Sequence, residues 1–399
     1  MGVHSSGNAK RVLAPLLSEW GDPIASPLAL ALEQRRRRGE PVFDFIQANP
    51  QEHGFEYPPE RLAQAIADAC VTAHFYKPDP RGQIAAREAV AAYHGSISPE
   101  QVVLTPGTSM AYWYTFRLLA RPGGNVLCPA PTYPLFDDLA RLAGLQVRSY
   151  HLEHKATGAW RLNPEEIEFQ ITPHTCALVL VSPHNPTGMV ANIEELCEIA
   201  TIAMRHRLPI VFDEVFCEFL HDAPYVPRPS EFTAPLCVTL NGLSKMLSLP
   251  GLKAGWMVVE GSDRELTRAF VSALEYASDT FLPVSEIVQA ALPALLSSQS
   301  LAICQQFAQK YRHRMSALVA QWQGQGFAVS RPEGGVYLPV PLPAAIASDE
   351  SVALALLEEL GIYCHAGSSY AMPTPHLITT CVPRPPWPIQ EIADFFRSG

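Results

Sequence analysis

Short apolar runs alternate with segments of helical periodicity from residue 101 onward. Periodicity alone does not separate a short buried strand from a buried helix, but the regular spacing of these runs favours strands. Buried strands that are separated by helices are typical of a mainly parallel sheet. We therefore predict an α/β fold with strands at Val102–Leu104, Val126–Cys128, Gln146–Tyr150, Ala177–Val181, Ile210–Phe212, Cys237–Leu240 and Gly255–Val259.

The two ends of the chain have a different pattern of apolar and polar residues. The pattern predicts an N-terminal arm with one helix over residues 11–40, and mostly helices from residue 265 to Gln323. Further elements are predicted as short strands at Val42–Ile46 and His376–Val382, and as helices at Pro58–Thr72, Ile84–Tyr93 and Ser351–Leu360. We expect the two ends to form a smaller α+β domain. The expected division is 1–50 for the arm and part of that domain, 51–290 for the large domain, and 291–399 for the C-terminal small domain.

Composition narrows the functional classes. The chain has 399 residues, of which 48% are hydrophobic and 17% charged, which excludes a disordered chain or a coiled coil. The formal net charge of −10 argues against a nucleic-acid partner, which would require a basic face. The sequence holds no apolar stretch of about 20 residues, so we expect no membrane partner. The nine cysteines form no Cys-x-x-Cys pair and the histidines show no ligand spacing, so we expect reduced thiols, no metal site and a cytoplasmic location.

The strongest chemical feature is Lys245. It follows a predicted strand, within Asn241-Gly242-Leu243-Ser244-Lys245, and a glycine- and proline-rich segment comes after it. Removal from water lowers the pKa of a lysine and makes it a competent imine-forming nucleophile. A lysine in a loop is more often a solvated surface residue, so Lys245 alone does not decide the function.

Three further motifs stand beside predicted strands. The rigid turn Ser182–Gly188 follows one strand, and the ends of strands are where ligands bind in open α/β sheets. Asp213 closes another strand, where its carboxylate is either a helix cap or the partner of a protonated cofactor ring. Thr105–Ala111 joins a strand to a helix, and its free N–H groups and hydroxyls would suit a phosphate. Each motif alone also fits an ordinary turn or cap.

The order of these four motifs carries a resemblance. A phosphate turn, Asn-Pro-Thr-Gly, an aspartate at a strand end and Ser-Lys together make the chain similar to the fold-type I pyridoxal-phosphate enzymes of the class I/II aminotransferase family, roughly over residues 25–395. The resemblance implies a three-layer large domain with a mainly parallel sheet and a smaller α+β domain. It also implies three catalytic residues. Lys245 would form the internal aldimine and carry the proton, Asp213 would pair with the pyridine nitrogen, and Asn185 would donate to the 3-oxygen of the ring.

The resemblance implies a set of cofactor contacts as well. Tyr133 lies where the family stacks an aromatic ring on the pyridine. The phosphate contacts would come from Gly107, Thr108, Ser109, Ser244 and Lys253. Tyr76 matches the tyrosine that reaches the phosphate of the neighbouring subunit, which implies a homodimer. Tyr112-Trp113-Tyr114 is interpreted as helix packing, although Tyr112 could also face the cofactor.

Several positions depart from the family pattern. Phe216 replaces a tyrosine that would donate to the 3-oxygen, Lys253 replaces an arginine, and Ala48 stands where a substrate-side glycine is usual. In the family, an arginine in the strand pattern Arg-Ile-Ser holds the carboxylate of the substrate. In this chain Leu377-Ile378-Thr379 aligns with that pattern, so the arginine is absent. Either Arg384 supplies this clamp from a shifted position, or the carboxylate is absent, modified or bound by other groups; we favour the second account. Tyr337, after Gly334-Gly335, is a further candidate for substrate contact.

The reaction stays open between two alternatives. The family default is transamination of an amino acid or related amine. The sequence also has some similarity to capreomycidine synthase around Pro-His-Asn-Pro and the Pro-Arg-Pro tail, which implies elimination, replacement or cyclisation at Cβ or Cγ in specialised-metabolite biosynthesis. The substrate itself cannot be deduced from these motifs.

Overall fold

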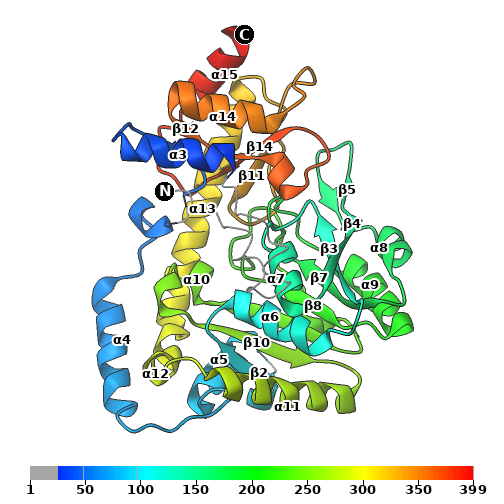
Figure 1. The fold of residues 1–399 in the computed structure, drawn as a ribbon. Coiled ribbons are helices and arrows are strands. Elements are labelled where there is room, and N and C mark those ends of the chain that lie inside the picture. Colours follow the sequence, from blue (N-terminus) through cyan, green and yellow to red (C-terminus); the bar gives the residue numbers. More distant parts are fainter. Residues whose placement is uncertain (1–25, 48, 96, 399) are drawn as a thin grey trace, which may run out of the picture.

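A computed structural model describes residues 26–398 except 48 and 96, and its central element is a seven-stranded sheet (Figure 1). The strand order is β2-β10-β9-β8-β7-β3-β4, and β10 alone runs antiparallel to its neighbours. The strands of the described chain are β1 Phe43–Asp44, β2 Val102–Thr105, β3 Asn125–Ala130, β4 Gln146–His151, β5 Glu153–His154, β6 Trp160–Arg161, β7 Thr175–Val181, β8 Ile210–Asp213, β9 Cys237–Gly242, β10 Gly255–Glu260, β11 Tyr337–Pro341, β12 Ile362–Tyr363, β13 His365–Ala366 and β14 His376–Thr380.

The central strands are apolar because both faces of the sheet are covered. In β7 every residue is buried, with Ala177, Val179 and Val181 in one hydrophobic cluster and Leu178 and Leu180 in another. Successive side chains of a strand point to opposite faces, so a continuous apolar run means helices on both sides. The layers are therefore helix, sheet and helix.

The helices divide between the two faces of the sheet. Residues of α6, α7 and α11 pack in one cluster, and α8 and α9 pack in the other. The α-helices of the described chain are α3 Pro27–Arg37, α4 Pro59–Thr72, α5 Ile84–His94, α6 Thr108–Leu119, α7 Phe136–Ala143, α8 Pro164–Gln170, α9 Ile193–His206, α10 Leu243–Met246, α11 Arg264–Phe281, α12 Glu286–Leu295, α13 Ser298–Gly324, α14 Asp349–Leu360 and α15 Ile389–Ser398.

A smaller α+β region lies at one end of the molecule. It contains the antiparallel sheet β11-β14-β13, the parallel pair β1-β12, and the helices α3, α14 and α15. Figure 1 shows α13, in yellow, running from beside α12 up to this region. The N-terminal strand β1 pairs with β12 from the C-terminal third, which joins the two ends of the chain as the sequence predicts.

The predicted α/β fold is confirmed. All seven predicted runs are strands of the one large sheet, and the five strands from β4 to β9 in sheet order are mutually parallel. The short hairpin β5-β6 was not anticipated, because two-residue strands leave no periodic pattern. The division of the chain at residues 50 and 290 stays a prediction. In the described chain no single helix is long and apolar enough to cross a membrane, and one bent pair, α12 with α13, passes on length and composition alone.

Candidate active site

One cavity lies where the ends of several strands meet. Because β2, β7, β8 and β9 run in the same direction, their C-terminal ends share one edge of the sheet. The cavity is lined by Gly107, Thr108, Ser109, Tyr112, Tyr133, Phe136, Val181, Asn185, Asp213, Val215, Phe216, Gly242, Ser244, Lys245, Ala254 and Tyr337. The four motifs singled out in the sequence therefore converge on one place, although they are far apart along the chain.

Lys245 comes from the short helix α10, directly after β9. Its amino group lies 5.8 Å from the centre of the Phe216 ring. Burial lowers the pKa of Lys245, and the carboxylate of Asp213 opposes that change. A lowered pKa increases the share of the neutral amine, which is the nucleophilic form.

Asp213 is the last residue of β8 and is buried. Its Oδ1 accepts a hydrogen bond from the backbone N–H of Val215 at 3.0 Å, and its Oδ2 accepts one from the hydroxyl of Tyr112 at 2.8 Å. Burial raises the pKa of Asp213, while these two hydrogen bonds and the charge of Lys245 lower it. The carboxylate is thus held by fixed donors at the wall of the cavity.

The start of α6 forms another wall. Its cap residue Gly107 has φ +140°, a conformation that favours glycine, and no side chain caps the helix. The first N–H groups of a helix have no partner within the helix, and they attract anions. The backbones are close here, because a side-chain carbon on Gly255 would lie 3.0 Å from the Cα of Gly107. This wall suits a phosphate group.

Two residues close the cavity from other directions. Asn185, in the turn after β7, is 8% exposed, and its amide oxygen is buried without a hydrogen-bond partner. Tyr337 comes from β11 of the smaller region, and its ring lies edge-on to Phe216 at 6.1 Å. The side chain of Tyr133 lies edge-on to Phe136 at 5.6 Å. Together with Phe136 and Phe216, the two tyrosines give the cavity an aromatic lining.

A buried ionic network lies next to the cavity. Glu214, which follows Asp213, is fully buried. It accepts a hydrogen bond from Asn241 at 2.8 Å and lies 3.3 Å from Nε of Arg228. Asn241 in turn accepts a bond from the N–H of Gly242 at 2.7 Å. Because these residues adjoin Asp213 on β8 and the Ser244-Lys245 segment after β9, the network ties the two strand ends together.

Three predicted site residues within the described chain are not among those that line the cavity. Lys253 is exposed, one residue before the cavity residue Ala254. Tyr76 is 77% exposed on the loop after α4. Arg384 is exposed in the segment after β14, and Ala48 lies outside the described residues. The structure therefore brings together the predicted residues of the sheet edge, but not Lys253 and Tyr76, which were expected to contact the cofactor phosphate, nor Arg384, which was a candidate for substrate contact.

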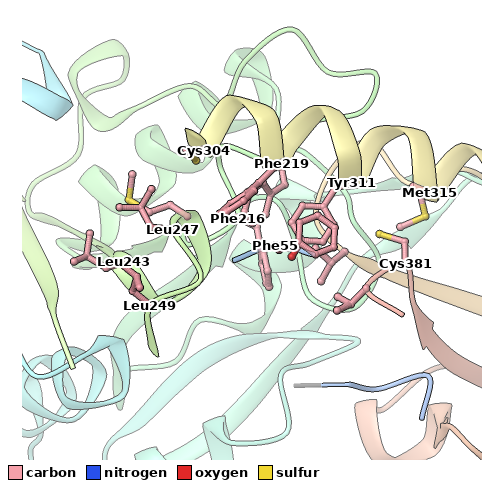
Figure 2. Packing of buried hydrophobic residues seen from close by; sticks show 14 of the residues in the cluster. Phe55, Phe216, Phe219, Leu243, Leu247, Leu249, Cys304, Tyr311, Met315 and Cys381 are labelled. Carbon is pink, nitrogen blue, oxygen red and sulfur yellow. The ribbon is translucent and has the colours of Figure 1, made fainter. Parts of the chain in front are cut away.

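Arg384 belongs to a separate group of cations. Its guanidinium and the amino group of Lys310 both lie beside Gly54. From there a row of aromatic contacts leads toward the cavity: Phe55 stacks on Tyr311 with ring centres 3.8 Å apart, and Tyr311 lies 4.7 Å from Phe219 (Figure 2). Phe55 and Tyr311 are buried. Arg384 itself is not among the residues that line the cavity.

The register of β14 changes the sequence comparison at the missing arginine. In the antiparallel pair, Thr380 lies opposite Tyr337, and Ile378 lies opposite Pro339. Opposite residues of an antiparallel pair share a face. Leu377 instead packs with the core of the smaller region. The residues on the same face as Tyr337 are therefore Ile378 and Thr380, not Leu377 as the sequence alignment indicated.

Sequence reasoning left the role of Tyr112 open, and the structure places this residue in the cavity wall. The interpretation as helix packing was incomplete, because the hydroxyl donates to Asp213. The spacing of Tyr112 from Thr108 in the sequence could have indicated its place in the cavity wall. Tyr112 is four residues after Thr108, and residues four apart share one face of a helix.

Comparison with known proteins identifies the family. The sequence matches the family "Aminotransferase class I and II" over residues 43–385. The chain belongs to this family. As a family member, this aminotransferase is a pyridoxal-phosphate-dependent enzyme of fold type I.

Individual relatives agree with this assignment. The aminotransferase is 28% identical to an alanine aminotransferase of Mycobacterium bovis, covering 90% of this chain and 86% of the relative. It is 27% identical to the glutamate-pyruvate aminotransferase AlaA of Escherichia coli, covering 90% and 91%. Its fold is similar to that of an alanine aminotransferase of Pyrococcus furiosus, with a TM-score of 0.84, 22% identity and coverage of 99% and 98%. The similarity to capreomycidine synthase stays an expectation from the sequence.

The residues of the cavity fit the cofactor of this family. The uncapped start of α6 suits the phosphate, the buried carboxylate of Asp213 suits a protonated ring nitrogen, and the buried Lys245 suits a carbonyl group. The buried amide oxygen of Asn185 has no hydrogen-bond partner, and since buried polar atoms are normally hydrogen-bonded, it would accept from a donor on a bound ligand, while its NH2 group would be the donor to the 3-oxygen.

Proposed function

We propose that this enzyme is an aminotransferase that takes an amino group from a small amino acid or a related amine, with Lys245, Asp213 and Asn185 as its catalytic residues. The observation that carries the proposal is that Lys245 and Asp213 line the same buried cavity, whose far wall is the uncapped start of α6. The named activities of the alanine and glutamate-pyruvate aminotransferases support an amino acid as substrate.

Pyridoxal phosphate, when bound, supplies an electron sink for the substrate carbon that bears the amino group. The residues of the chain have separate tasks. The first N–H groups of α6, the hydroxyls of Thr108, Ser109 and Ser244, and the nearby charge of Lys253 would bind the phosphate. Asp213 would hold the proton on the ring nitrogen, and Asn185 would donate to the 3-oxygen.

Lys245 would move the proton. Its Nζ has a lowered pKa, so a larger fraction is neutral at the pH of the cell and can accept a proton from the substrate carbon. The ring of Tyr133 would stack on the cofactor and exclude water, and Tyr337 would contact the substrate. Phe216 has no hydroxyl, so Asn185 would be the main donor to the 3-oxygen.

A homodimer belongs to the same proposal, with Tyr76 reaching the neighbouring site. Phe75 and Tyr76 are 65% and 77% exposed. Their loop is tied to α12 by a hydrogen bond from the N–H of Lys77 to Glu286, close to the exposed Phe281 and Leu282 at the end of α11. Exposed apolar side chains that gather in one area are typical of protein interfaces. A cytoplasmic location remains part of the proposal.

Two points from the sequence bear on the substrate. No feature of the cavity favours elimination, replacement or cyclisation at Cβ or Cγ, so transamination is the reaction we propose. Arg384 lies beside Gly54 and does not line the cavity, which supports the account in which the substrate carboxylate is absent, modified or bound by other groups.

The test is the absorption spectrum of the purified protein with pyridoxal phosphate. We expect a near-ultraviolet or visible band that disappears in Lys245→Ala. The matched control is Lys155→Ala, since Lys155 pairs with Glu153 on the surface and should leave the band unchanged. A band that survives in Lys245→Ala would contradict the role of Lys245.

The reaction is tested next by adding single amino donors without an acceptor. Transamination predicts that the band is replaced by that of the amine form of the cofactor, with one equivalent of a 2-oxo acid released. Repeated turnover of a donor with the original band restored would instead indicate elimination or cyclisation.

A further inference from the structure

Tyr112 makes a contact that the proposed chemistry has not used. Its side chain is 2% exposed, and its hydroxyl donates to Oδ2 of Asp213 at 2.8 Å. The other carboxylate oxygen, Oδ1, already accepts the N–H of Val215. Both oxygens of the carboxylate therefore have one fixed donor, and each keeps a further lone pair for a ligand.

The tyrosine ring has little freedom to move. It packs against Phe116 at 5.5 Å and against Phe136 at 5.3 Å between ring centres, and both of these side chains are buried. Buried aromatic side chains in a close-packed core stay in one rotamer. The direction of the hydroxyl is thus determined by the core and not by the ligand.

Tyr112 also connects two ends of the cavity through one helix. It lies four residues after Thr108 on α6, a rise of about 6 Å along the axis. The N-terminus of α6 faces the proposed phosphate site, and Tyr112 reaches the carboxylate proposed for the ring nitrogen. A single rigid element therefore sets the separation of the two groups that would hold opposite parts of the cofactor.

We propose that Tyr112 is a positioning residue, whose hydroxyl keeps Asp213 ionised and oriented toward the ring nitrogen of the cofactor. This inference rests on the proposed function. A donor to a carboxylate favours its charged form, and burial has the opposite effect on Asp213, so each donor matters more than it would in water. With the hydroxyl removed, Asp213 would retain more of the shared proton and the ring nitrogen less.

The test compares Tyr112→Phe with Tyr150→Phe as a matched control. Tyr150 is also fully buried, and its hydroxyl donates at 2.9 Å to the backbone oxygen of Val179, away from the cavity. Both variants lose one buried hydroxyl donor, so their thermal stabilities should fall by similar amounts. Only Tyr112→Phe should alter the site.

Two readouts besides activity are measured on the full-length enzyme. In Tyr112→Phe the dissociation constant of pyridoxal phosphate should rise roughly tenfold, as expected for the loss of a hydrogen bond to a charged group. The nitrogen-15 resonance of ring-labelled cofactor should move toward that of the unprotonated pyridine. Unchanged values in Tyr112→Phe, or equal changes in Tyr150→Phe, would overturn the proposal.

Two additions keep the outcome decisive. If Tyr112→Phe does not fold, site-specific 3-fluorotyrosine is placed at position 112, because it retains the shape of tyrosine and its hydroxyl is a stronger donor. The nitrogen-15 resonance of the cofactor should then move toward that of the protonated pyridine. No movement overturns the proposal. If the wild-type protein binds no cofactor, the proposed function fails, and infrared titration of the Asp213 carboxyl still decides the effect of Tyr112. Its pKa should then rise by roughly one unit in Tyr112→Phe.

Discussion

The cavity is built from two regions that differ in their chemistry. The edge of the seven-stranded sheet contributes Asp213, Asn185, Lys245 and the start of α6. The three-stranded sheet of the smaller region contributes Tyr337, and presents Ile378 and Thr380 on the same face. The first region contributes titratable and amide side chains, whereas the second contributes uncharged side chains. The part of the cavity that we propose binds the cofactor (the cofactor half) and the part that we propose faces the substrate (the substrate half) therefore differ in their side-chain chemistry.

The charges of the two regions are also treated differently. At the sheet edge, Asp213 and Glu214 are buried with fixed partners. On and beside α13, the cations Lys310 and Arg314 lie over the ring of Phe55 and Arg384 lies beside Gly54, and none of the three lines the cavity. Substitutions should therefore have large effects at the first region and small effects at the second.

The largest effect should come from Asp213→Ala. This change removes the buried carboxylate that is proposed to hold the ring nitrogen, and loss of one member of a buried ionic pair costs about 3–5 kcal/mol. We expect kcat/KM to fall by roughly 10²–10⁴-fold. The control is Asp222→Ala, whose carboxylate forms a partly exposed pair with Arg331. Steady-state kinetics check this, and comparable losses in both variants would contradict the role proposed for the carboxylate of Asp213.

A large effect on stability should follow Glu214→Ala. The change leaves Arg228 and Asn241 without their buried partner, which should lower the free energy of unfolding by about 3 kcal/mol. The exposed pair of Arg37 with Glu33 offers the control, because Glu33→Ala should cost about 0–1 kcal/mol. Urea unfolding measures both. A loss below that of Glu33→Ala would mean that the network does not support the sheet edge.

Acid should destabilise both regions through buried histidines. Burial lowers the pKa of His94, beside Glu214, to about 3 and that of His365, in the three-stranded sheet, to about 4. Because the unfolded chain then binds more protons than the folded one, stability is lost as pH falls from about 6.5 toward these values.

The two regions can be separated by single variants. His94→Gln and His365→Gln should each reduce the difference in unfolding free energy between pH 7 and pH 5 by about 1–2 kcal/mol. His313→Gln, an exposed position on α13, serves as the control and should leave the difference as it is. A steeper pH dependence in either buried-site variant would mean that the histidine is charged, not neutral, in the folded protein.

The smallest effect is expected for Arg384→Ala. The side chain is exposed and does not line the cavity, so KM for the amino donor should change about threefold or less. A rise of tenfold or more, with kcat preserved, would show that Arg384 reaches the substrate and that the substrate half is ionic as well. Steady-state kinetics with a single donor measure the change.

Much of the cofactor half was predictable because its signals are local. A short buried run ends at Asp213 or Gly242, and the functional side chain stands at or just after that end. Parallel strands bring such ends to one edge, so the sequence pattern already implied their convergence. The substrate half was less predictable. Leu377 and Ile378 are neighbours in sequence but lie on opposite faces, and only the pairing with Tyr337 and Pro339 decides which of them faces the site.

By itself, the sequence determined the α/β fold, the seven strands and the motifs at their ends, because burial on both faces imposes a pattern on adjacent residues. Only the tertiary structure decided that Tyr112 reaches Asp213, that Glu214 joins Asn241, and that Arg384 lies outside the cavity. Such contacts join residues far apart in the chain, and they depend on packing distances and register that no local pattern records.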